Sequence, residues 1–528
     1  MPLPMTAGAW PPEDQRSIFR SLEEWQAWWS GDLELLRKVY AGHAPRPTFQ
    51  GRGGVVGAVQ RFWHGQPRRA NQAQTKLHVP LAADICQASS DLLFAEPISV
   101  TVENEAAQER VQQILDDGFH STVATAAEIA AALGGTYLRV VWDESVLDHP
   151  FIDTVDADYA VPEFKWSRLR AVTFYFNVGR QGQSVLRHAE RHEIENGHGV
   201  IYHALYQGTE TELGSQIPLD RHPATAGITV DDAGRVDTGS PGLAAVYVPN
   251  VLPNRRWRKH PVGRNLGRSD LDQLEPMLDA LDEVYASWMR DIRLGKARIV
   301  AGRSALEDLG PGGGASFDLD REVYEGVNVP PGAAKDAGLA VEQIQFAIRY
   351  AEHLETAKEL TRIILRTAGY SASTFGDAGE RSVATAADVH SRDRRTELTR
   401  GRKERHFTTG LQRLFGKLLD IDQVVFGGPG RAGLPVAVSF PDGAQDSQLE
   451  AAQTVQALYS AQAASTEVRV QMMHPDWDQS QIDTEVERIM AEFSLSDPDR
   501  VGVDGRSLSD EFLDNLDDPL PDELAEEE

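Results

Sequence analysis

The sequence predicts an α+β chain in which a mixed region of strands and helices precedes two long helices. Strand-like and helix-like segments alternate through residues 99–249, and two helical stripes follow on either side of an insertion at residues 295–340. Apolar and aromatic residues make up 41% of the 528 residues and charged residues 25%, which is typical of a globular protein. A chain of this length predicts two to four folded units.

The first half of the chain supplies the mixed region. Residues 1–50 are predicted to be helical at their centre, because large apolar side chains recur there every three or four residues. These side chains are Trp25, Trp28, Trp29, Leu33, Leu36 and Tyr40. Helices are expected over residues 84–93 and 105–133, around a strand at 98–102. Further strands are expected at residues 137–142, 171–178, 188–195, 199–206 and 244–248, joined by turns rich in glycine and aspartate.

A strict heptad stripe begins after the mixed region. Its members, spaced 3, 4, 3, 4, 3 and 4 residues apart, are Leu271, Leu274, Leu278, Leu281, Tyr285, Trp288 and Ile292. This spacing predicts a helix whose apolar seam packs against another helix, or else one face of an ordinary core helix. Ser269 or Asp270 is expected to cap the helix, and Pro276 lies within its first turns, which leaves the start open or kinked.

The second half of the chain is predicted to be mainly helical. Strands are expected at 297–301 and 322–329, and a second long helix at 341–367, whose stripe runs from Val341 to Ile364. Residues 370–380 are small and polar with two glycines, which predicts a mobile loop. A long charged helix at 382–419, a strand-like segment at 425–441 and two helices at 446–464 and 478–493 follow, with Ser465 as a cap between the last two.

The charge is unevenly distributed. The formal net charge is −28, and residues 507–528 contain ten acidic and no basic residues, which predicts a flexible acidic tail. So acidic a chain does not attract nucleic acid overall, and any DNA contact must be local or deliberately weak. Two basic islands, residues 255–268 and 390–406, are candidates for contact with phosphate or with an acidic neighbour. Ion pairing within the chain or between subunits is the alternative for both.

The sequence offers no catalytic, cofactor or metal site. Neither Gly-Lys pair is followed by Ser or Thr, so a phosphate-binding loop of the Walker type is missing. The histidines His188, His192, His198 and His203 lack the spacing of a zinc motif, and we expect exposed strand histidines. Residues 153–164 lack the glycine and glutamate of a calcium loop. Cys86, the single cysteine, is expected to be buried and inert in its helix.

No membrane span is expected either. The most apolar helical stretch, residues 123–133, is short and carries Glu128, which indicates a buried core helix. The first twenty residues lack the basic and apolar regions of a secretory signal.

The order of the segments resembles the portal proteins of tailed double-stranded DNA bacteriophages, in particular the siphophage type. Four stretches carry the resemblance: residues 84–100 (DICQASSDLLFAEPISV), 134–143 (GGTYLRVVWD), 267–292 with its Ser-Asp-Leu start, and 465–492 (STEVRVQMMHPDWDQSQIDTEVERIMAE). The first is similar to the family's helix that ends in a Leu-Phe-x-x-Pro-Ile turn, and the second to its Gly-x-x-Tyr-Leu strand. The resemblance spans roughly residues 75–495.

The resemblance implies a portal fold with a mixed α/β wing, a helical stem, a small α/β clip and a mainly helical crown, assembled as a ring. The implied parts are an N-terminal region and wing at 1–265, stem helices at 269–294 and 341–367, a clip at 295–340, a tunnel loop at 370–382, a long wing helix at 383–424, a crown at 425–495 and an acidic tail at 496–528.

The resemblance also implies a function. The protein would form a dodecameric ring at one capsid vertex, in the virion and, during assembly, in the host cytoplasm. The ring would be a passive channel for genome packaging and ejection, without enzymatic activity, cofactor or membrane contact. Its partners would be double-stranded DNA, the large subunit of a separate terminase, the major capsid and scaffolding proteins, and a head–tail adaptor. On the tunnel loop, Ser371, Ser373, Thr374 and Arg381 are expected to lie nearest the DNA phosphates.

Two alternatives remain open from the sequence. One is another structural protein of the capsid vertex or a scaffold-binding protein, which would not form a ring of fixed stoichiometry. The other is an enzymatic subunit of the packaging machinery, which would need a nucleotide or metal site.

Overall fold

The computed structural model describes residues 3, 6–43, 76–143, 145–294, 298–300, 307–308, 315–316, 342–344, 348–376, 386–429, 433–441, 448–474, 477 and 479–495. The chain divides into two compact units, Met1–Pro441 and Asp442–Glu528. The larger unit combines sheets and helices, and the described part of the smaller unit is helical. The chain is therefore α+β, as its sequence predicts.

A seven-stranded antiparallel sheet forms one layer of the larger unit. Its strands, in spatial order, are β1 (Thr6–Ala9), β9 (Glu212–Ile217), β8 (His198–Gly208), β7 (Ser184–Glu195), β6 (Arg168–Gln181) and β5 (Ala160–Lys165), and β10 (Arg235–Pro241) also pairs with β8. The turn between β7 and β8 is Asn196-Gly197, with φ of 51° and 90°. Positive φ at both positions is the geometry that twists a two-residue hairpin in the same sense as its strands.

A second, three-stranded sheet packs against the first. Its strands, in spatial order, are β11 (Ala245–Pro249), β3 (Gly135–Val141) and β4 (Phe151–Asp156). Tyr137 of β3 meets Phe174 of β6 with 5.5 Å between ring centroids, and both side chains are buried. The interface between the sheets is therefore closed by aromatic packing.

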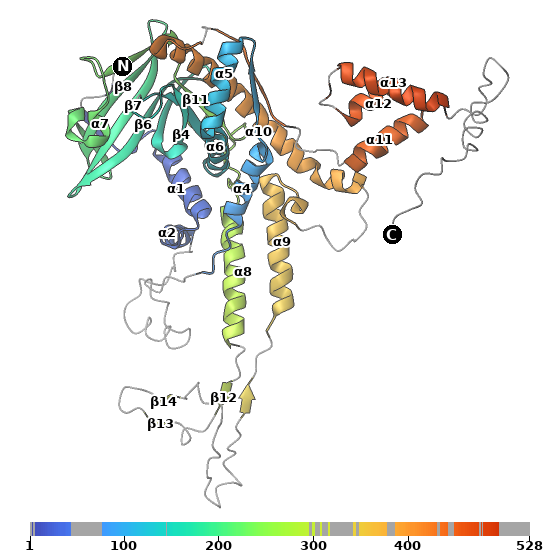
Figure 1. The fold of residues 1–528 in the computed structure, drawn as a ribbon. Helices are drawn as coiled ribbons and strands as arrows, with labels where there is room; N and C mark the ends of the chain where they lie inside the picture. Colours follow the sequence, from blue (N-terminus) through green and yellow to red (C-terminus); the bar gives the residue numbers. More distant parts are fainter. Residues whose placement is uncertain are drawn as a thin grey trace, which may run out of the picture. The chain divides into compact units, whose positions relative to one another are not determined.

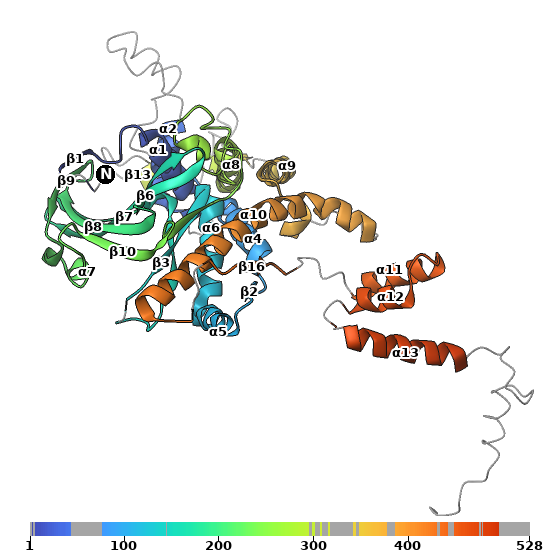
Figure 2. The ribbon, with the colours of Figure 1, turned by 90° about the horizontal axis from the view of Figure 1, so that it is seen from above.

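Two helices cover the second sheet, α6 (His120–Leu133) and the long α10 (Ala386–Ile421), which also runs past β10 and α4 (Figure 2). Two more helices lie behind them: α4 (Leu81–Phe94) packs on α6, and α5 (Glu105–Ile114) packs on β2 (Ser99–Val102). The helix α6 is buried almost all round, which confirms the predicted core helix, and its Glu128 accepts a hydrogen bond from Trp29. The short strands β2 and β16 (Val436–Ser439) pair with each other, so residues 433–441 belong to the larger unit.

The N-terminal helical segment is two helices, not one. Helix α1 (Arg16–Ser30) ends at Gly31, whose φ of 64° is left-handed, and α2 (Leu33–His43) begins after Asp32. The Asp32 carboxylate accepts a hydrogen bond from the backbone N–H of Glu34 at 2.7 Å. Trp25 and Trp28 are fully buried against the rest of the unit. The sequence predicts the apolar face but not the break at glycine.

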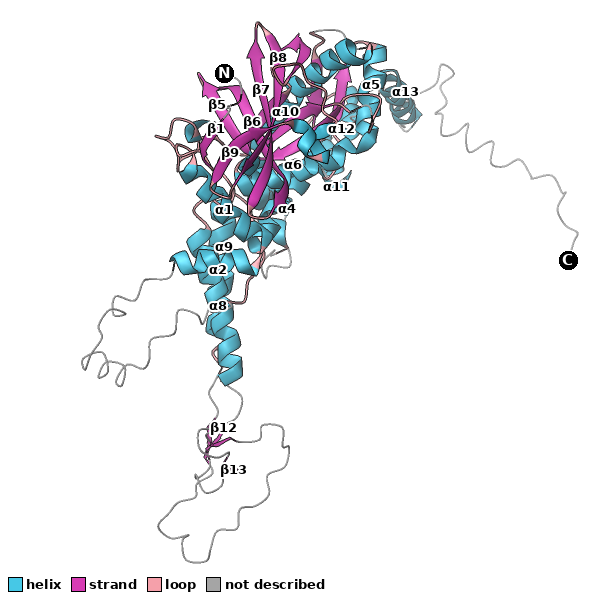
Figure 3. Ribbon diagram, turned by 90° about the vertical axis from the view of Figure 1, so that its left-hand side faces the viewer, coloured by secondary structure: helices cyan, strands magenta, loops and turns pink. Residues whose placement is uncertain are grey.

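Two long helices, α8 (Glu275–Leu294) and α9 (Tyr350–Ala368), extend from the larger unit (Figures 1 and 3). Both begin later than expected. Residues 269–274 form turns, and Pro276 lies in the first turn of α8, where its missing N–H costs no helical hydrogen bond. Residues 342–344 form the strand β15 (Glu342–Ile344) instead of helix, because they pair with β12 (Arg298–Val300).

Short strands are described in the insertion between these helices. Besides β12 and β15, the strands β13 (Glu307–Asp308) and β14 (Ala315–Ser316) pair with each other. The strand at β12 matches the one expected at 297–301. The strand expected at 322–329 lies outside the described residues.

The smaller unit has three described helices where the sequence predicts two. They are α11 (Gln448–Ser460), α12 (Thr466–Met473) and α13 (Gln479–Leu495). Ser465 is a cap, as expected, because its side chain accepts a hydrogen bond from the N–H of Val468 at the start of α12. Of the described apolar side chains in this unit, Val470 and Ile482 are buried.

Candidate functional site

The helices α8 and α9 lie side by side and antiparallel (Figure 1). Near the end of α8, the Trp288 ring lies parallel to the His353 ring of α9, with 6.1 Å between centroids. The Asp291 carboxylate contacts His353 of α9 and Arg349, the residue just before α9, each at 3.0 Å. Hydrogen bonds from His353 and Arg349 lower the pKa of Asp291. The pair of helices is thus held at this end by an aromatic contact and by charge.

The heptad stripe changes its surroundings along its length. Leu271 and Leu274 lie in the turns before α8, and Leu278 and Leu281 lie in its first turns; all four are at most 1% exposed. Tyr285 and Trp288 are half-buried, and Ile292 is 40% exposed. The first part of the stripe is therefore core within the chain, and the last part is only partly covered by the other described residues.

The loop after α9 begins as an anchored turn. Residues Ala372–Phe375 form a 3₁₀ turn, and the N–H of Ser371 donates to the Thr396 hydroxyl of α10 at 2.9 Å. The Thr374 hydroxyl contacts the same Thr396 hydroxyl at 2.9 Å. The structure therefore places Ser371, Ser373 and Thr374 on one turn, in which Ser371 and Thr374 contact α10, and residues 371–376 are an ordered turn where the sequence predicts a loop. Arg381 lies outside the described residues.

A buried polar cluster lies where this loop meets the start of α8. The Lys403 ammonium donates to Ser89 at 2.6 Å and to the Tyr370 hydroxyl at 2.9 Å, and pairs with the Asp270 carboxylate. Tyr370 donates to Asp270 at 2.7 Å, and Asn250 donates to its other carboxylate oxygen at 2.8 Å. Burial and the Asp270 charge raise the pKa of Tyr370, so its hydroxyl stays a donor. Below, these five residues are called the Lys403 cluster.

Sequence reasoning missed the Lys403 cluster. Asp270 is not a helix cap, because α8 begins five residues later. Ser269 also does not cap α8: its hydroxyl donates to the Ala132 carbonyl at 2.6 Å and accepts from the N–H of Leu271. The sequence did contain one signal for a buried polar group. Lys403 is a charged residue on the helix face that continues through the apolar residues Phe407 and Leu411.

The two basic islands are partly paired inside the chain. Arg256 contacts Asp272 at 3.0 Å and Glu275 at 2.8 Å. Arg400 donates to the Leu92 carbonyl at 2.7 Å, and Lys403 belongs to its cluster. These contacts favour intramolecular pairing for those three cations. Other members of the islands are exposed: Arg255, Arg258, Lys259, Arg264, Arg394, Arg395, Arg402 and Arg405.

The strand histidines are not all exposed, contrary to the sequence-based expectation. His192 is 1% exposed and His188 is 9% exposed, because β7 is covered on this face by the second sheet. His192 contacts Glu190 at 2.7 Å, and Glu190 also pairs with Arg139 of β3. Although burial opposes it, the Arg139 charge and the His192 hydrogen bond lower the pKa of Glu190 well below its usual value.

A histidine pair completes this network. His188 Nε2 lies 3.1 Å from His203 Nδ1, and the two rings are nearly parallel. Burial lowers the pKa of His203 to about 4 and lowers that of His188 as well. These five residues, Arg139, His188, Glu190, His192 and His203, are called the histidine network below. In the described residues, no group of three or more His, Cys, Asp or Glu side chains is placed to hold a metal ion.

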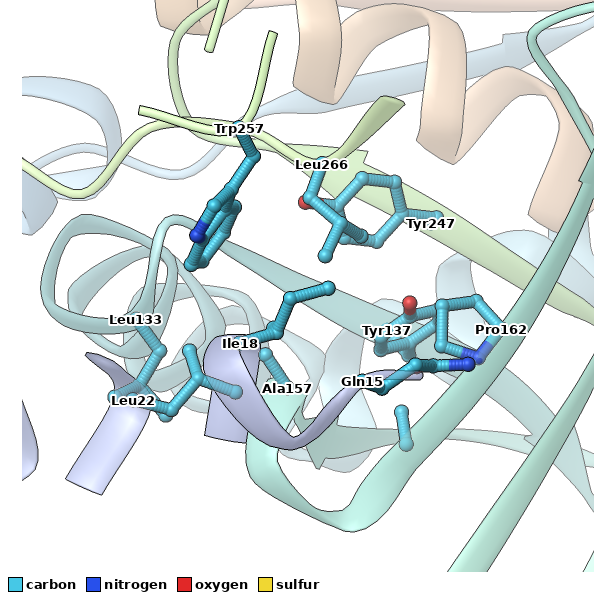
Figure 4. A pocket seen from close by; sticks show the side chains of 11 residues that line it. Gln15, Ile18, Leu22, Leu133, Tyr137, Ala157, Pro162, Tyr247, Trp257 and Leu266 are labelled. Carbon is cyan, nitrogen blue, oxygen red and sulfur yellow. The ribbon is translucent and has the colours of Figure 1, made fainter. Parts of the chain in front are cut away.

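Two cavities are described in the larger unit. One cavity has a volume of about 10 Å³. Figure 4 shows the side chains that line it, which are mainly apolar and aromatic, among them Ile18, Tyr247 and Trp257. That volume holds about one water molecule. A more open groove of about 490 Å³ lies between β2 and α5, and Asp116 and His120 are the titratable side chains that line it. Cys86 is buried, as expected.

The comparison with known families assigns the chain to a class of structural proteins. Residues 32–494 match the family model described as phage portal protein, SPP1 Gp6-like. The chain therefore belongs to the SPP1 Gp6-like family of phage portal proteins. A comparison with curated proteins finds no match. The family is structural and not enzymatic, and membership implies a component of the virion capsid. None of the described helices is long and apolar enough to cross a membrane.

Proposed function

We propose that the chain assembles into a dodecameric ring at one vertex of the capsid, and that the ring is a passive channel through which the genome is packaged and ejected. The observation that carries the proposal is the family match over residues 32–494. Homo-oligomeric rings close through heterologous contacts, in which one face of each copy meets a different face of the next.

The stem helices α8 and α9 supply the surface that such contacts need. Ile292 of α8 and Ile348 before α9 are 40% and 41% exposed, and Tyr350 is 62% exposed. These apolar groups lie toward the helix ends next to the insertion, where the other described residues leave them exposed. Packing against a neighbouring copy would remove them from water, which stabilises association by roughly 25 cal/mol per Å².

The acidic composition suits a channel that moves DNA. Duplex DNA carries one negative charge per roughly 1.7 Å, so a basic lumen would hold it and release would require counterion exchange. A chain with a net charge of −28 repels DNA weakly, over a screening length of about 8 Å at physiological salt. We therefore place the DNA contacts on the loop after α9, at Ser371, Ser373, Thr374 and Arg381.

The remaining parts follow the same proposal. The first 265 residues and the helix α10 form the wing, residues 295–340 form the clip, and residues 425–495 contribute the crown. The large terminase subunit docks on the clip and supplies the work of packaging. The capsid, scaffolding and head–tail adaptor proteins are the other partners.

The mass of the purified particle tests the proposal. Twelve chains of 58.1 kDa give a ring of about 700 kDa, which native mass spectrometry and negative-stain images with a central hole would show. A particle without a closed ring, even when capsid and scaffolding proteins are present, would favour a different structural role at the vertex. Nucleotide turnover by the purified chain would instead favour an enzymatic packaging subunit.

A further inference from the structure

The Lys403 cluster joins five segments that are far apart in the sequence. Ser89 lies on α4, Asn250 follows β11, Asp270 precedes α8, Tyr370 follows α9 and Lys403 lies on α10. Each of the five residues is at most 3% exposed. The ammonium group of Lys403 on α10 is therefore where three parts of the chain meet. The other two are the end of α9 and the turns at residues 269–274 just before α8, called the root of α8 below.

Every strong polar group in this cluster has a partner. An ammonium has three protons, and Lys403 directs them at Ser89, Tyr370 and Asp270. One Asp270 oxygen accepts from Tyr370 and the other accepts from Asn250. The Tyr370 hydroxyl thus accepts from Lys403 while it donates to Asp270. Such a cluster fixes angles as well as distances, which apolar contacts do not.

The same face of α10 binds the turn that follows Tyr370. Thr396, Thr399 and Lys403 are three and four residues apart, so they share one face of the helix. Thr399 donates to the Gly369 carbonyl at 2.7 Å, and Thr396 binds Ser371 and Thr374. Gly369 has φ of 107°, and a Cβ there would lie 2.9 Å from the Thr399 hydroxyl. Residues 369–376 are therefore clamped closely on α10.

A buried ion pair is weak support for a role in stability alone. Desolvation of the two charges opposes their attraction, and apolar groups of similar volume often stabilise a fold equally well. What the ion pair adds is a single arrangement of the segments that it joins.

We propose that Lys403 is a positioning residue, which fixes residues 369–376 relative to the root of α8 through Tyr370 and Asp270. The loop after α9 and the first turns of α8 then move as one body with α10. That DNA contacts this loop rests on the proposed function, because the contact belongs to the assembled ring. The attachment of residues 369–376 to the root of α8 through Lys403, called the joint below, is a property of each single chain.

The chain contains a matched control for this proposal. Lys417 lies on the same helix and is 6% exposed. Its ammonium donates to Thr238 and to the Ser240 carbonyl, each at 2.9 Å, so it contacts neither the loop nor α8. Lys417→Met therefore removes a buried lysine from α10 without touching the joint.

Hydrogen–deuterium exchange of the purified full-length chain tests the proposal. We compare wild type, Lys403→Met and Lys417→Met in peptides that cover residues 369–376 and residues 269–278. Lys403→Met is expected to speed exchange in both peptides by about tenfold or more, because the two segments lose their common anchor. Lys417→Met is expected to leave both peptides unchanged. Equal changes in the two variants, or a Lys403→Met variant that keeps either peptide protected, would overturn the proposal.

Tyr370→Phe covers the case in which Lys403→Met does not fold. This variant keeps the buried ring and removes only the hydroxyl that bridges Lys403 and Asp270. It is expected to speed exchange in the 369–376 peptide while the thermal unfolding midpoint stays close to wild type; unchanged exchange contradicts the joint. The particle mass is measured on the same samples. A chain that shows the joint but does not form a ring disproves the proposed function alone, and a ring without the joint disproves the inference alone.

Discussion

The Lys403 cluster and the histidine network are both buried in the larger unit. They differ in how many of their polar atoms have a hydrogen-bond partner. The Lys403 cluster pairs one ammonium and one carboxylate, and every proton of the ammonium has an acceptor. The histidine network contains three imidazoles, and the Nδ1 atom of the buried His192 has no hydrogen-bond partner among the described residues. The first therefore fixes an arrangement, and the second contains two imidazoles, those of His188 and His203, whose pKa values are lowered by burial.

The difference reflects what each grouping connects. The five residues of the Lys403 cluster lie on helices or in loops, outside the strand ladders. The histidine network lies between two sheets, where Arg139 of β3 reaches Glu190 of β7, and the strand ladders already fix the geometry. A network placed between rigid ladders can tolerate an incomplete hydrogen-bond set, because it is not needed for alignment.

Removal of the Lys403 ammonium gives the largest expected effect. Lys403→Met leaves the Asp270 carboxylate buried without a cation, which costs about 3–5 kcal/mol in the free energy of unfolding. Adding Asp270→Asn removes the unpaired charge and is expected to restore a large part of that loss. Urea denaturation of the single and double variants measures both values. If the double variant is as unstable as the sum of its parts, the two residues are not coupled.

Glu190→Gln is expected to have a smaller effect. The amide keeps the size of the side chain, and Arg139 retains its contacts with Asp153 at 2.8 and 3.0 Å. We expect a loss of about 1–3 kcal/mol, the cost of one imperfectly paired buried group. Glu195→Gln, at the partly exposed end of the same strand, is the control and is expected to change stability by less than about 1 kcal/mol. Equal losses of unfolding free energy in the two variants would show that the burial of Glu190 does not explain its contribution to stability.

Periodicity predicted most of the elements but not the contacts between them. The strands β6, β7 and β8 and the helices α8 and α9 follow from local sequence patterns, and α10 was expected as a charged helix. The uninterrupted helix expected over residues 105–133 is wrong, because the chain leaves helical geometry at Asp117 and Gly118, where Gly118 has φ of 89°, between α5 and α6. The predicted start of α9 at residue 341 was wrong, because residues 342–344 pair with β12, a strand more than forty residues earlier. Local spacing does not reveal such a partner.

The candidate site shows the same limit. Asp270 has the sequence context of a cap, and only the folded chain brings Lys403, 133 residues away, to its carboxylate. The strand histidines were expected at the surface because alternation does not say which faces of a strand are covered. The assignment of Ser371, Ser373 and Thr374 to one loop was local and could be made, whereas the attachment of Ser371 and Thr374 to Thr396 could not.

The histidine network is expected to make the fold sensitive to acid. His203 faces His188, Glu190, His192 and Arg139, and its pKa in the folded state is about 4, against about 6.5 in an unfolded chain. Between these values the unfolded state binds the extra proton, so stability falls as the pH is lowered from 6.5 to 4. The slope from one such proton is at most about 1.4 kcal/mol per pH unit.

The difference in unfolding free energy between wild type and His203→Gln isolates this contribution. Urea titrations at several pH values are expected to give a flatter curve for the variant below pH 6.5. His198→Gln, on the same strand with its side chain 53% exposed, is expected to follow wild type. Parallel curves for wild type and His203→Gln would place the acid sensitivity elsewhere.

The ion pair between Asp291 of α8 and Arg349, just before α9, is exposed to solvent, unlike the two buried groupings. Arg349 contacts Asp291 at 3.0 Å, but its side chain is 62% exposed. Solvent screens such a pair, and its side chains lose entropy when they are held, so Arg349→Ala is expected to cost only about 0.2–1 kcal/mol. His353 still contacts Asp291 after the substitution, which reduces the loss further.

In 1 M salt, where the screening length is about 3 Å, the difference in stability between Arg349→Ala and wild type should vanish, whereas the loss caused by Lys403→Met should persist. A salt-resistant loss at Arg349 would show that this end of the stem is shielded from solvent, as it would be if a second copy covered it.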